Sequence, residues 1–457
     1  MRRPRLSILR KQSANGQAAE PIAGSELDSL FAVYSGFETI ALAISGGPDS
    51  LALLHLSLDW RARLPGRGPQ FIVLAVDHGL RPEAAAEAAN VAQGAVALGL
   101  QARVLTRDAP ASPTALQAAA RSDRYRLLAA AAREAGAQAL ATGHTLDDQA
   151  ETLLMRLARG SGVDGLSAMS PISRPGDLTL LRPLLGLTKL RLEASLRARD
   201  ISWVVDPSNA NPAFERPRLR ALAPALAAAG LSAGAIATSA RRLARGRAAL
   251  EQVTNDAALR LVTIHGAGFF EIDRVGFEAL PEEIRLRLLG HLISRIGTPD
   301  QPERLARLER LVAQLSLGPA PAASLAGCLV SASALAIGVL REPGRDGLPE
   351  LQLRPGDCLA WDRRFDVSLV PQAASGVLVR ALQASDLRGE SATAARASGL
   401  PRAALMALPS AWRGDVLIAA PLPGLTSPEV TFATTLAHPW GRSVGANDVA
   451  TLADQDV

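Results

Sequence analysis

The segment Ser45-Gly46-Gly47-Pro48-Asp49-Ser50 has the residue types of a phosphate-binding turn. It follows the apolar run 39–44, which predicts a buried strand, and it leads into 51–56, which predicts a helix. Glycines let backbone N–H groups approach an anion, and a helix N-terminus adds partial positive charge. The segment is not a Walker A loop, because no Lys-Ser or Lys-Thr closes it. A plain Gly-Pro turn is the alternative, but the order of strand, glycines, acid and helix favours a nucleotide site.

A second polar cluster is the sequence GHTLDDQAET at 143–152, which follows another predicted strand. Asp148 and Glu151 are three residues apart and therefore share a helix face, and His144 and Asp148 are four apart. Mg²⁺ binds one or two carboxylates together with phosphate oxygens, so acids beside a phosphate loop indicate a Mg²⁺ site. The alternative is an ordinary N-capped helix with solvated acids.

Arginines suited to phosphate contact occur in three further places. Arg121 and Arg124 are three apart on a predicted helix, and Arg159 precedes a flexible Gly-Ser-Gly segment. A third group surrounds a predicted domain junction and consists of Arg216, Arg218, Arg220, Arg241, Arg242, Arg245 and Arg247. Phe214 is its only aromatic neighbour, which favours backbone contact over base reading. Solvated helix faces, and a glycine helix cap after Arg159, are the alternatives.

Alternation of strand and helix patterns places these residues in a fold. Further strands are predicted at 71–76, 101–105 and 137–142, with helices at 82–98, 114–136 and 146–158. This order predicts a parallel sheet with helices on both faces. Ligands bind at the carboxyl ends of such strands, so the loops at 45–50, 77–81 and 143–148 are expected at one edge. The segment DHGLR at 77–81 also suits a simple Asp-led turn.

The rest of the chain predicts additional domains. Helices are predicted at 187–199, 216–226, 231–262 and 281–316, and short strands such as 365–370 follow. Boundaries near 225 and 320, together with the end of the basic N-terminal segment near 35, give four segments. They are a basic, flexible N-terminal segment (1–35), an α/β domain (36–225), a helical domain (226–320) and a mixed, β-containing C-terminal domain (321–457) with a disordered tail after about 436.

Charge and cysteine content narrow the class of protein. The net charge is +5, and the excess lies in residues 1–230, which hold 26 Lys and Arg against 21 Asp and Glu. A polyanionic partner suits that half. Only Lys11 and Lys189 are lysines among 49 basic residues, which we interpret as compositional bias. Two cysteines without a CxxC motif suit a reducing, cytoplasmic compartment, and we predict no membrane span.

Taken together, the motifs resemble one family, the tRNA(Ile)-lysidine synthases of the PP-loop ATP pyrophosphatase superfamily. The matching segments lie between about 36 and 225 and read, in order, SGGPDS, VDHGLR, AARSDRYRLL, ATGHTLDDQAET, RLARGSGVDGLSAM, LLRPLL and DPSN followed by ERPRLR. Weaker similarity to proteobacterial members continues in segments such as WDRRF at 361–365. Pro217 stands where the family usually has Asn, so the resemblance supports a role for Arg220 more strongly than for Arg216.

The resemblance implies an adenine nucleotide alpha hydrolase-like fold and a two-step reaction. ATP adenylates the C2 oxygen of the wobble cytidine in tRNA(Ile) with a CAU anticodon and releases pyrophosphate. The ε-amine of L-lysine then attacks C2 and expels AMP. The product base, lysidine, pairs with A instead of G and switches charging from methionine to isoleucine.

The resemblance also implies roles for individual residues. ATP contacts are expected from Ser45, Gly46, Gly47, Pro48, Asp49, Ser50 and Arg121. Catalytic roles are expected for Asp49, His144, Asp148 and Arg220, with Arg121 and Arg220 near a phosphate or the lysine carboxylate. Asp49 and Asp148 are candidate Mg²⁺ ligands, and whether His144 or Asp148 handles lysine stays open. The two later domains are expected to hold the tRNA, and a homodimer is one assembly that the resemblance allows.

Other enzymes of the same superfamily, and a binding module without activity, stay open as alternatives. A tRNA 2-thiolation enzyme would commonly use paired cysteines, but Cys328 and Cys358 lie outside the predicted nucleotide-binding domain. Amidotransferase-type relatives would need a cysteine nucleophile, and none is suitably placed. A catalytically silent nucleotide- or RNA-binding module would not need the acids at 49, 148 and 151. Pyrophosphate release that depends on tRNA would discriminate among these alternatives.

Overall fold

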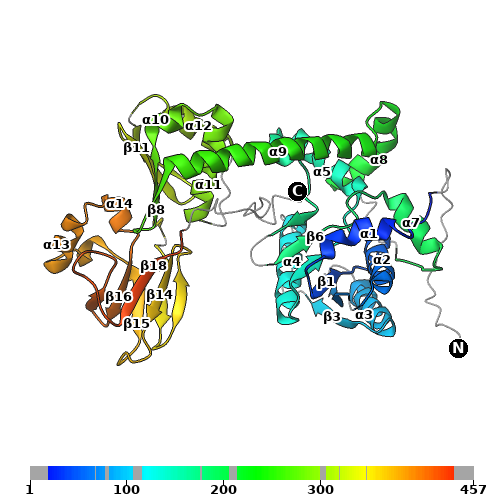
Figure 1. The fold of residues 1–457 in the computed structure, drawn as a ribbon, viewed down its shortest axis with the longest axis horizontal. Helices are drawn as coiled ribbons and strands as arrows, with labels where there is room; N and C mark the ends of the chain where they lie inside the picture. Colours follow the sequence, from blue (N-terminus) through cyan, green and yellow to red (C-terminus); the bar gives the residue numbers. More distant parts are fainter. Residues whose placement is uncertain are drawn as a thin grey trace. The chain divides into compact units, whose positions relative to one another are not determined.

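The computed structural model describes residues 19–66, 68–77, 82–106, 116–174, 178–204, 214–298, 305–318, 320–345 and 347–436 of the 457-residue chain. The chain divides into two compact units, with the boundary between Ala248 and Ala249 (Figure 1). Four features discussed above lie outside the described residues. They are the first 18 residues, the loop at 78–81, the segment 205–213 that contains DPSN, and the tail after 436.

A six-stranded sheet forms the centre of the first unit, with strand order β3-β2-β1-β4-β6-β5. Its strands are β1 (Thr39–Ala43), β2 (Gln70–Asp77), β3 (Gln101–Thr106), β4 (Ala139–Ala141), β5 (Ile172–Ser173) and β6 (Thr179–Leu181). All neighbouring pairs are parallel except β5 with β6. The predicted parallel sheet is confirmed, and the short β5–β6 pair extends it.

Helices cover both faces of this sheet because apolar side chains point to both sides of β1. Ile40 and Leu42 lie in one core with residues of α2 (Pro48–Arg63), α3 (Pro82–Ala97) and α7 (Lys189–Arg197). Ala41 lies in the opposite core with α4 (Leu116–Glu134). Figure 1 shows α4 on one side of β1 and α2 on the other. Period-two alternation along a strand buried on both faces produces this arrangement.

The order of the strands creates a crevice at one edge. β1 has β2 on one side and β4 on the other. The chain adds β2 and β3 on one side of β1 and then β4 and β6 on the other, so the direction of winding reverses between β1 and β4. Ligands of open α/β sheets bind at such a reversal, outside the carboxyl ends of the strands. Helices α2 and α5 (Leu146–Ala158) both begin there.

The described part of the N-terminal segment is folded, so the prediction of a flexible segment over 1–35 is wrong for those residues. Ile22, Leu27, Phe31 and Tyr34 are buried in the core that contains α2. They include residues of α1 (Glu26–Leu30) and of the 3-10 turn η1 (Phe31–Tyr34). The basic residues at the extreme N-terminus masked the short amphipathic pattern that follows them.

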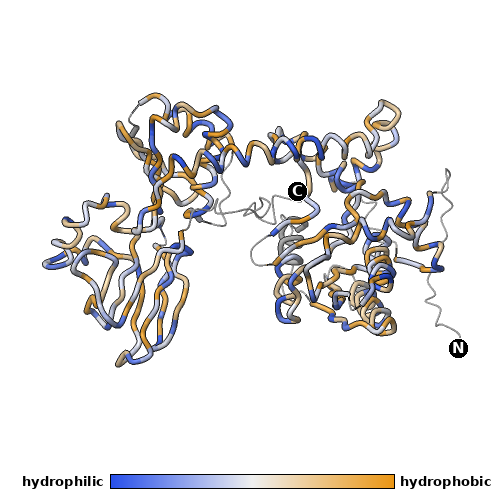
Figure 2. Tube along the Cα trace, viewed as in Figure 1, coloured by the Kyte–Doolittle hydropathy of each residue, from blue (hydrophilic) through white to orange (hydrophobic). Residues whose placement is uncertain are grey.

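Three more helices complete the first unit and lead out of it. They are α6 (Val163–Leu166), α8 (Glu215–Ala228) and α9 (Ala233–Leu261), and the boundary between the units falls within α9. Figure 2 shows hydrophilic and hydrophobic residues alternating along α9, as in a helix with a solvated side. Among the described residues, no single helix is long and apolar enough to cross a membrane; the pair α8 and α9, bent by 97°, passes that test only when joined.

A five-stranded antiparallel sheet, ordered β7-β8-β11-β10-β9, forms the first half of the second unit. Its strands are β7 (Val262–His265), β8 (Phe269–Asp273), β9 (Ala320–Leu325), β10 (Cys328–Ala332) and β11 (Ala336–Arg341). Helices α10 (Arg274–Glu278), α11 (Glu282–Ile296) and α12 (Leu305–Leu315) pack against it. The predicted boundary near 320 therefore divides a single sheet, and the segment expected to be helical contains a hairpin.

Two smaller sheets and three short helical elements form the other half of the second unit. The sheets are ordered β12-β15-β16-β17 and β13-β14-β18. The strands are β12 (Leu351–Leu353), β13 (Cys358–Trp361), β14 (Phe365–Leu369), β15 (Val377–Ala381), β16 (Pro409–Arg413), β17 (Val416–Ala419) and β18 (Val430–Thr434). The helical elements are η3 (Ala384–Asp386), α13 (Glu390–Ala397) and α14 (Arg402–Leu405). The predicted mixed, β-containing character of this region is confirmed.

A buried ion network joins the two halves of the second unit. Asp362 accepts hydrogen bonds from Arg341 of β11 (3.2 Å) and from Arg364 (2.8 Å). Arg364 also donates to the carbonyls of Gly268 (3.0 Å) and Ala407 (2.6 Å), and its side chain is only 1% exposed. The WDRRF segment noted in the sequence thus links sheets that are distant along the chain.

Candidate active site

The glycine turn after β1 is a compact, self-bonded structure. Ser50 Oγ donates to the carbonyl of Gly47 (2.9 Å) and accepts from the N–H of Ser45 (3.1 Å). Gly46 has φ +83°, a conformation that favours glycine, and Gly47 caps α2 with Pro48 in its first turn. The N-terminus of α2 therefore lies at the sheet edge, where free backbone N–H groups suit an anion. Asp49 lies in the first turn of the same helix.

The loop after β4 packs directly against this turn. A Cβ on Gly143 would lie 2.9 Å from the carbonyl oxygen of Asp49, so only glycine permits this approach. The following helix, α5, begins at the same edge. The two polar clusters found in the sequence thus lie side by side, as predicted from the parallel sheet.

Helix α5 fixes Asp148 through a capping box. Thr145 donates to Asp148 Oδ2 from both its N–H and its hydroxyl, each at 2.8 Å, and the Thr145 hydroxyl accepts from the N–H of Asp148. Oδ2 is therefore committed to the cap, and Oδ1 faces the crevice. His144 precedes the cap and lies outside the helix, with Nδ1 2.8 Å from Thr142 Oγ1. The sequence predicted that His144 and Asp148, four residues apart, share a helix face. Because His144 precedes the helix, this spacing does not determine where its side chain lies.

Lys189 brings a positive charge between the two acids. Its Nζ lies 3.3 Å from Asp148 Oδ1 and 3.6 Å from Asp49 Oδ2. Its own N–H, at the start of α7, donates to Asp147 Oδ2 (2.8 Å). Lys189 lies 140 positions beyond Asp49 and was not predicted as a site residue. Its one signal in the sequence is that it is one of only two lysines in a chain rich in arginine.

Arg220 of α8 makes the tightest ion pair of the site. Its Nε and Nη2 donate to the two carboxylate oxygens of Glu151 at 2.6 and 3.1 Å. Its Nη2 also lies 3.7 Å from Asp148 Oδ1. The structure thus brings the predicted residues Asp49, Asp148 and Arg220 together. Arg121 lies on α4, but its side chain is not among those that the structure describes.

The environment separates the pKa values of the two acids. Burial raises the pKa of Asp49 to about 6, opposed by the charge of Lys189 and reinforced by that of Asp148. Burial also acts to raise the pKa of Asp148, but the positive charges of Lys189, His144 and Arg216 outweigh it and hold this pKa well below its usual range. One carboxyl group is therefore firmly ionised, while its neighbour titrates closer to neutral pH.

The donor set at this edge suits Mg²⁺. Asp49 Oδ1 is buried and has no hydrogen-bond partner within the described part of the chain. Asp148 Oδ1 faces cations, whereas its Oδ2 is used by the capping box. Across the described ranges there is no group of three or more His, Cys, Asp or Glu that could hold a metal ion. A carboxylate pair completed by phosphate oxygens is how Mg²⁺ usually binds beside nucleotides.

Arg159, another predicted anion contact, is paired with a carboxylate at the end of α5. Arg159 caps the end of α5 and pairs with Glu215 (2.7 Å), and Gly160 after it has φ +71°. The Arg-Gly-Ser-Gly segment thus forms the glycine helix end that was its alternative interpretation.

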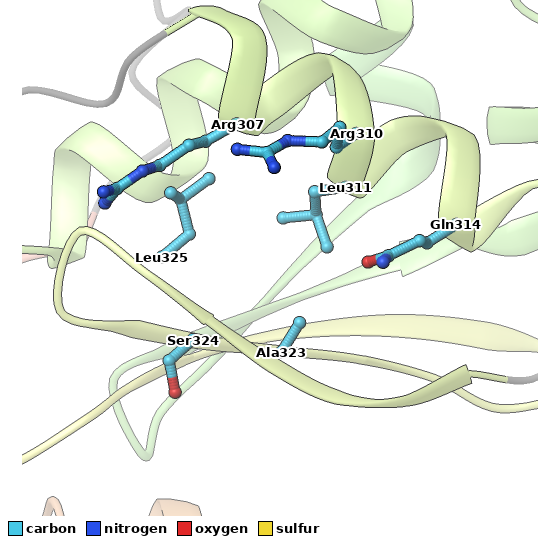
Figure 3. A pocket seen from close by; sticks show the side chains of 7 residues that line it. All are labelled: Arg307, Arg310, Leu311, Gln314, Ala323, Ser324 and Leu325. Carbon is cyan, nitrogen blue, oxygen red and sulfur yellow. The ribbon is translucent and has the colours of Figure 1, made fainter.

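A separate hollow in the second unit carries two arginines (Figure 3). Its volume is about 280 Å³, and it lies between α12 and β9. Arg307 and Arg310 of α12 line one side, and Ala323 and Ser324 of β9 line the other. Gln314 extends the polar side of the same helix.

Comparison with known proteins agrees with the geometry of the sheet edge. The PP-loop domain family matches residues 20–226. With its parallel sheet, glycine turn and acid pair, the first unit is a PP-loop ATP-binding domain, the class that the sequence predicted.

The most similar curated relatives are all tRNA(Ile)-lysidine synthases. Those of Bradyrhizobium sp. and Rhodopseudomonas palustris are each 45% identical, and each match covers 73% of this chain and 98% or 99% of the relative. That of Ruegeria pomeroyi is 40% identical, covering 85% of this chain and 89% of the relative. The chain therefore belongs to the tRNA(Ile)-lysidine synthase family, whose members are ATP-using ligases.

Proposed function

We propose that this enzyme ligates L-lysine to C2 of the wobble cytidine of tRNA(Ile) with a CAU anticodon, through an adenylated cytidine. The observation that carries the proposal is the pairing of Asp49, in the glycine turn, with Asp148 of α5 around one positive charge. This pair lies at the sheet edge where ATP binds in the PP-loop class. Membership in the family supports the choice of tRNA and amino acid.

In the first step the turn residues position the triphosphate of ATP. The N–H groups of the turn and the N-terminus of α2 face the phosphates, and the C2 oxygen of the base attacks the α-phosphate. Mg²⁺, when held by Asp49 and Asp148, would supply charge that stabilises the departing pyrophosphate. Arg220, held by Glu151, contributes fixed positive charge at the same place, and Lys189 adds a positive charge on a flexible side chain.

In the second step the ε-ammonium of lysine must lose a proton before it attacks C2. Asp148 stays ionised, because its pKa is lowered, and so can orient the ammonium group. His144 begins the loop at the same edge, with Nδ1 2.8 Å from Thr142 Oγ1, and in its neutral form would accept that proton. AMP is the leaving group, which explains why the C2 oxygen has to be adenylated first.

The target base must leave its stack to reach this crevice, so the tRNA needs support elsewhere. We assign that role to residues after about 225, as expected from the sequence. Arg307 and Arg310 beside the α12–β9 hollow offer planar donors for RNA phosphates.

Pyrophosphate release from Mg-ATP tests the proposed function. Purified protein is supplied with unmodified tRNA(Ile) (CAU), with and without L-lysine, and with tRNA(Met) as the control. We expect release only with tRNA(Ile) and incorporation of lysine into that tRNA. Release without tRNA preference would indicate a different PP-loop substrate, and no release under any condition would indicate a silent binding module.

A further inference from the structure

The ammonium group of Lys189 is held loosely. Its distances of 3.3 and 3.6 Å to Asp148 and Asp49 exceed the 2.7–2.9 Å typical of charge-assisted hydrogen bonds. The neighbouring Arg220–Glu151 pair, at 2.6 and 3.1 Å, is bidentate and close. Lys189 therefore neutralises the two acids without being fixed to either.

The backbone of Lys189 is anchored, but its ammonium can move. The N–H of Lys189 donates to Asp147 (2.8 Å), and Thr188 caps α7 by accepting from the N–H of Arg191. The four-carbon stem of lysine is flexible, so a change of rotamer can move Nζ away from the acids while α7 stays in place. About a quarter of the side chain (27%) is exposed, which leaves a path for this movement.

Lys189 and Mg²⁺ require the same oxygens. The ammonium faces Asp49 Oδ2 and Asp148 Oδ1, which are atoms that a divalent ion would bind between the two acids. Two positive ions a few ångströms apart repel each other strongly in a partly buried site. Two neighbouring carboxylates without any cation are also unfavourable. Either Lys189 Nζ or a divalent ion therefore occupies the space between the two acids, while Arg220 stays paired with Glu151.

We propose that Lys189 is the resident counter-ion of the Asp49–Asp148 pair and competes with Mg²⁺ for it. The metal enters with ATP, because the phosphates add the negative charge that receives the displaced ammonium. Free Mg²⁺ therefore binds poorly before ATP arrives. This inference rests on the proposed role of Asp49 and Asp148 as metal ligands, but not on the identity of the tRNA or the amino acid.

Binding of Mn²⁺ to the full, nucleotide-free protein, followed by electron paramagnetic resonance, tests the competition. We expect weak binding by the wild type and by Lys189→Arg, which keeps the charge. Lys189→Met should bind Mn²⁺ at least about tenfold more tightly, because a repelling charge is removed. Adding Asp49→Asn to Lys189→Met should return binding to the weak level, which locates the ion.

Thermal unfolding with and without Mg²⁺ gives a second readout that needs no activity. Lys189→Met should unfold at a lower temperature than the wild type without metal and should regain stability when Mg²⁺ is added. Equal Mn²⁺ affinity in Lys189→Met and the wild type, or no gain in stability with Mg²⁺, would overturn the inference. Failure of the tRNA-dependent pyrophosphate assay with intact Mn²⁺ competition would instead overturn the proposed function.

Discussion

Asp49 and Asp148 are the same residue type, yet their surroundings give them different chemistry. Asp148 Oδ2 accepts hydrogen bonds in the cap of α5, and Asp148 Oδ1 faces the cations of the site. Asp49 has one buried oxygen without a partner in the described structure and one oxygen near Lys189. A sequence motif identifies both acids, but only their hydrogen bonds show which oxygen is available to a ligand.

Asp49→Ala should abolish adenylation while leaving tRNA binding nearly intact. The substitution removes a proposed Mg²⁺ ligand, and with it charge that would stabilise the departing pyrophosphate, so we expect pyrophosphate release to fall by about 10²-fold or more. Pyrophosphate release and a filter-binding assay with tRNA(Ile) measure the two effects separately. A parallel loss of tRNA binding would contradict the role assigned to Asp49.

Asp49 should also impose a pH dependence on stability when neither metal nor nucleotide is present. Its pKa is raised from 3.8 to about 6 in the folded protein, so the folded state holds this proton more strongly than the unfolded state. The contribution of Asp49 to the free energy of unfolding therefore falls as pH rises from about 4 to 6. Urea denaturation at pH 4.5 and pH 7 should show this difference in the wild type relative to Asp49→Asn.

The contribution of Asp148 to the free energy of unfolding changes with pH in the opposite direction, so denaturation experiments distinguish the two acids. Its pKa is lowered on folding, so its contribution is present above its ordinary pKa of 3.8 and is lost as pH falls further. If the free energy of unfolding of the wild type changed with pH in parallel with that of Asp49→Asn between pH 4.5 and 7, folding would not raise the pKa of Asp49.

At the scale of elements, the geometry of the site depends on close contact between the glycine turn after β1 and the loop after β4. Gly143→Ala would place a Cβ 2.9 Å from the carbonyl of Asp49 and push the turn away from α5. We expect pyrophosphate release to fall by tenfold or more, since about 1 Å of misplacement can cost about 10²-fold. Gly94→Ala in α3 is the control, because nothing lies within 4 Å of its Cβ position. Unchanged activity in Gly143→Ala would show that the contact does not position Asp49.

In the second unit, Asp362 holds distant elements together through its ion pairs with Arg341 and Arg364. Asp362→Ala would leave Arg341 and Arg364, whose side chains are 10% and 1% exposed, without their carboxylate. Breaking a buried ion pair in this way costs about 3–5 kcal/mol. Hydrogen exchange of β13 and β14 should accelerate by about 10²-fold or more, with β1 to β4 unchanged as an internal control. Unaltered protection of β14 would contradict a stabilising role.

Local patterns predicted most of the first unit, whereas contacts between distant segments could not be read from the sequence. Apolar runs before Ser45 and Gly143 identified the strands and hence the shared edge. Lys189 stayed hidden because its partners belong to other elements, and compositional bias explained its presence equally well. The β7–β8 hairpin was missed because an alanine- and arginine-rich helical pattern runs up to Leu261. Its second strand, β8, also pairs with β11 far along the chain, and that pairing cannot be read from the local pattern.

At the scale of the whole molecule, chemistry belongs to the first unit and RNA support is assigned mainly to the second. Replacing Arg307 and Arg310 with Gln should weaken tRNA binding and lower the slope of log K against log salt concentration by about 1–2. Arg354→Gln with Arg402→Gln removes the same charge from exposed positions outside the hollow and is the matched control. Equal slopes for both double variants would exclude a specific contact at the hollow.

The strand order of the second unit also constrains the order of events during synthesis on the ribosome. The cores of the first unit include Leu196 of α7 and, beside α5, Ile236 and Ala240 of α9, so they can close once the chain has emerged to about Ala240. In the second unit, β8 pairs with β11, and Asp273 lies opposite Ala336. That sheet therefore waits for more than 60 further residues, during which the β7–β8 hairpin exposes an unpaired edge. The catalytic unit is thus ready to fold while the unit after it is still incomplete.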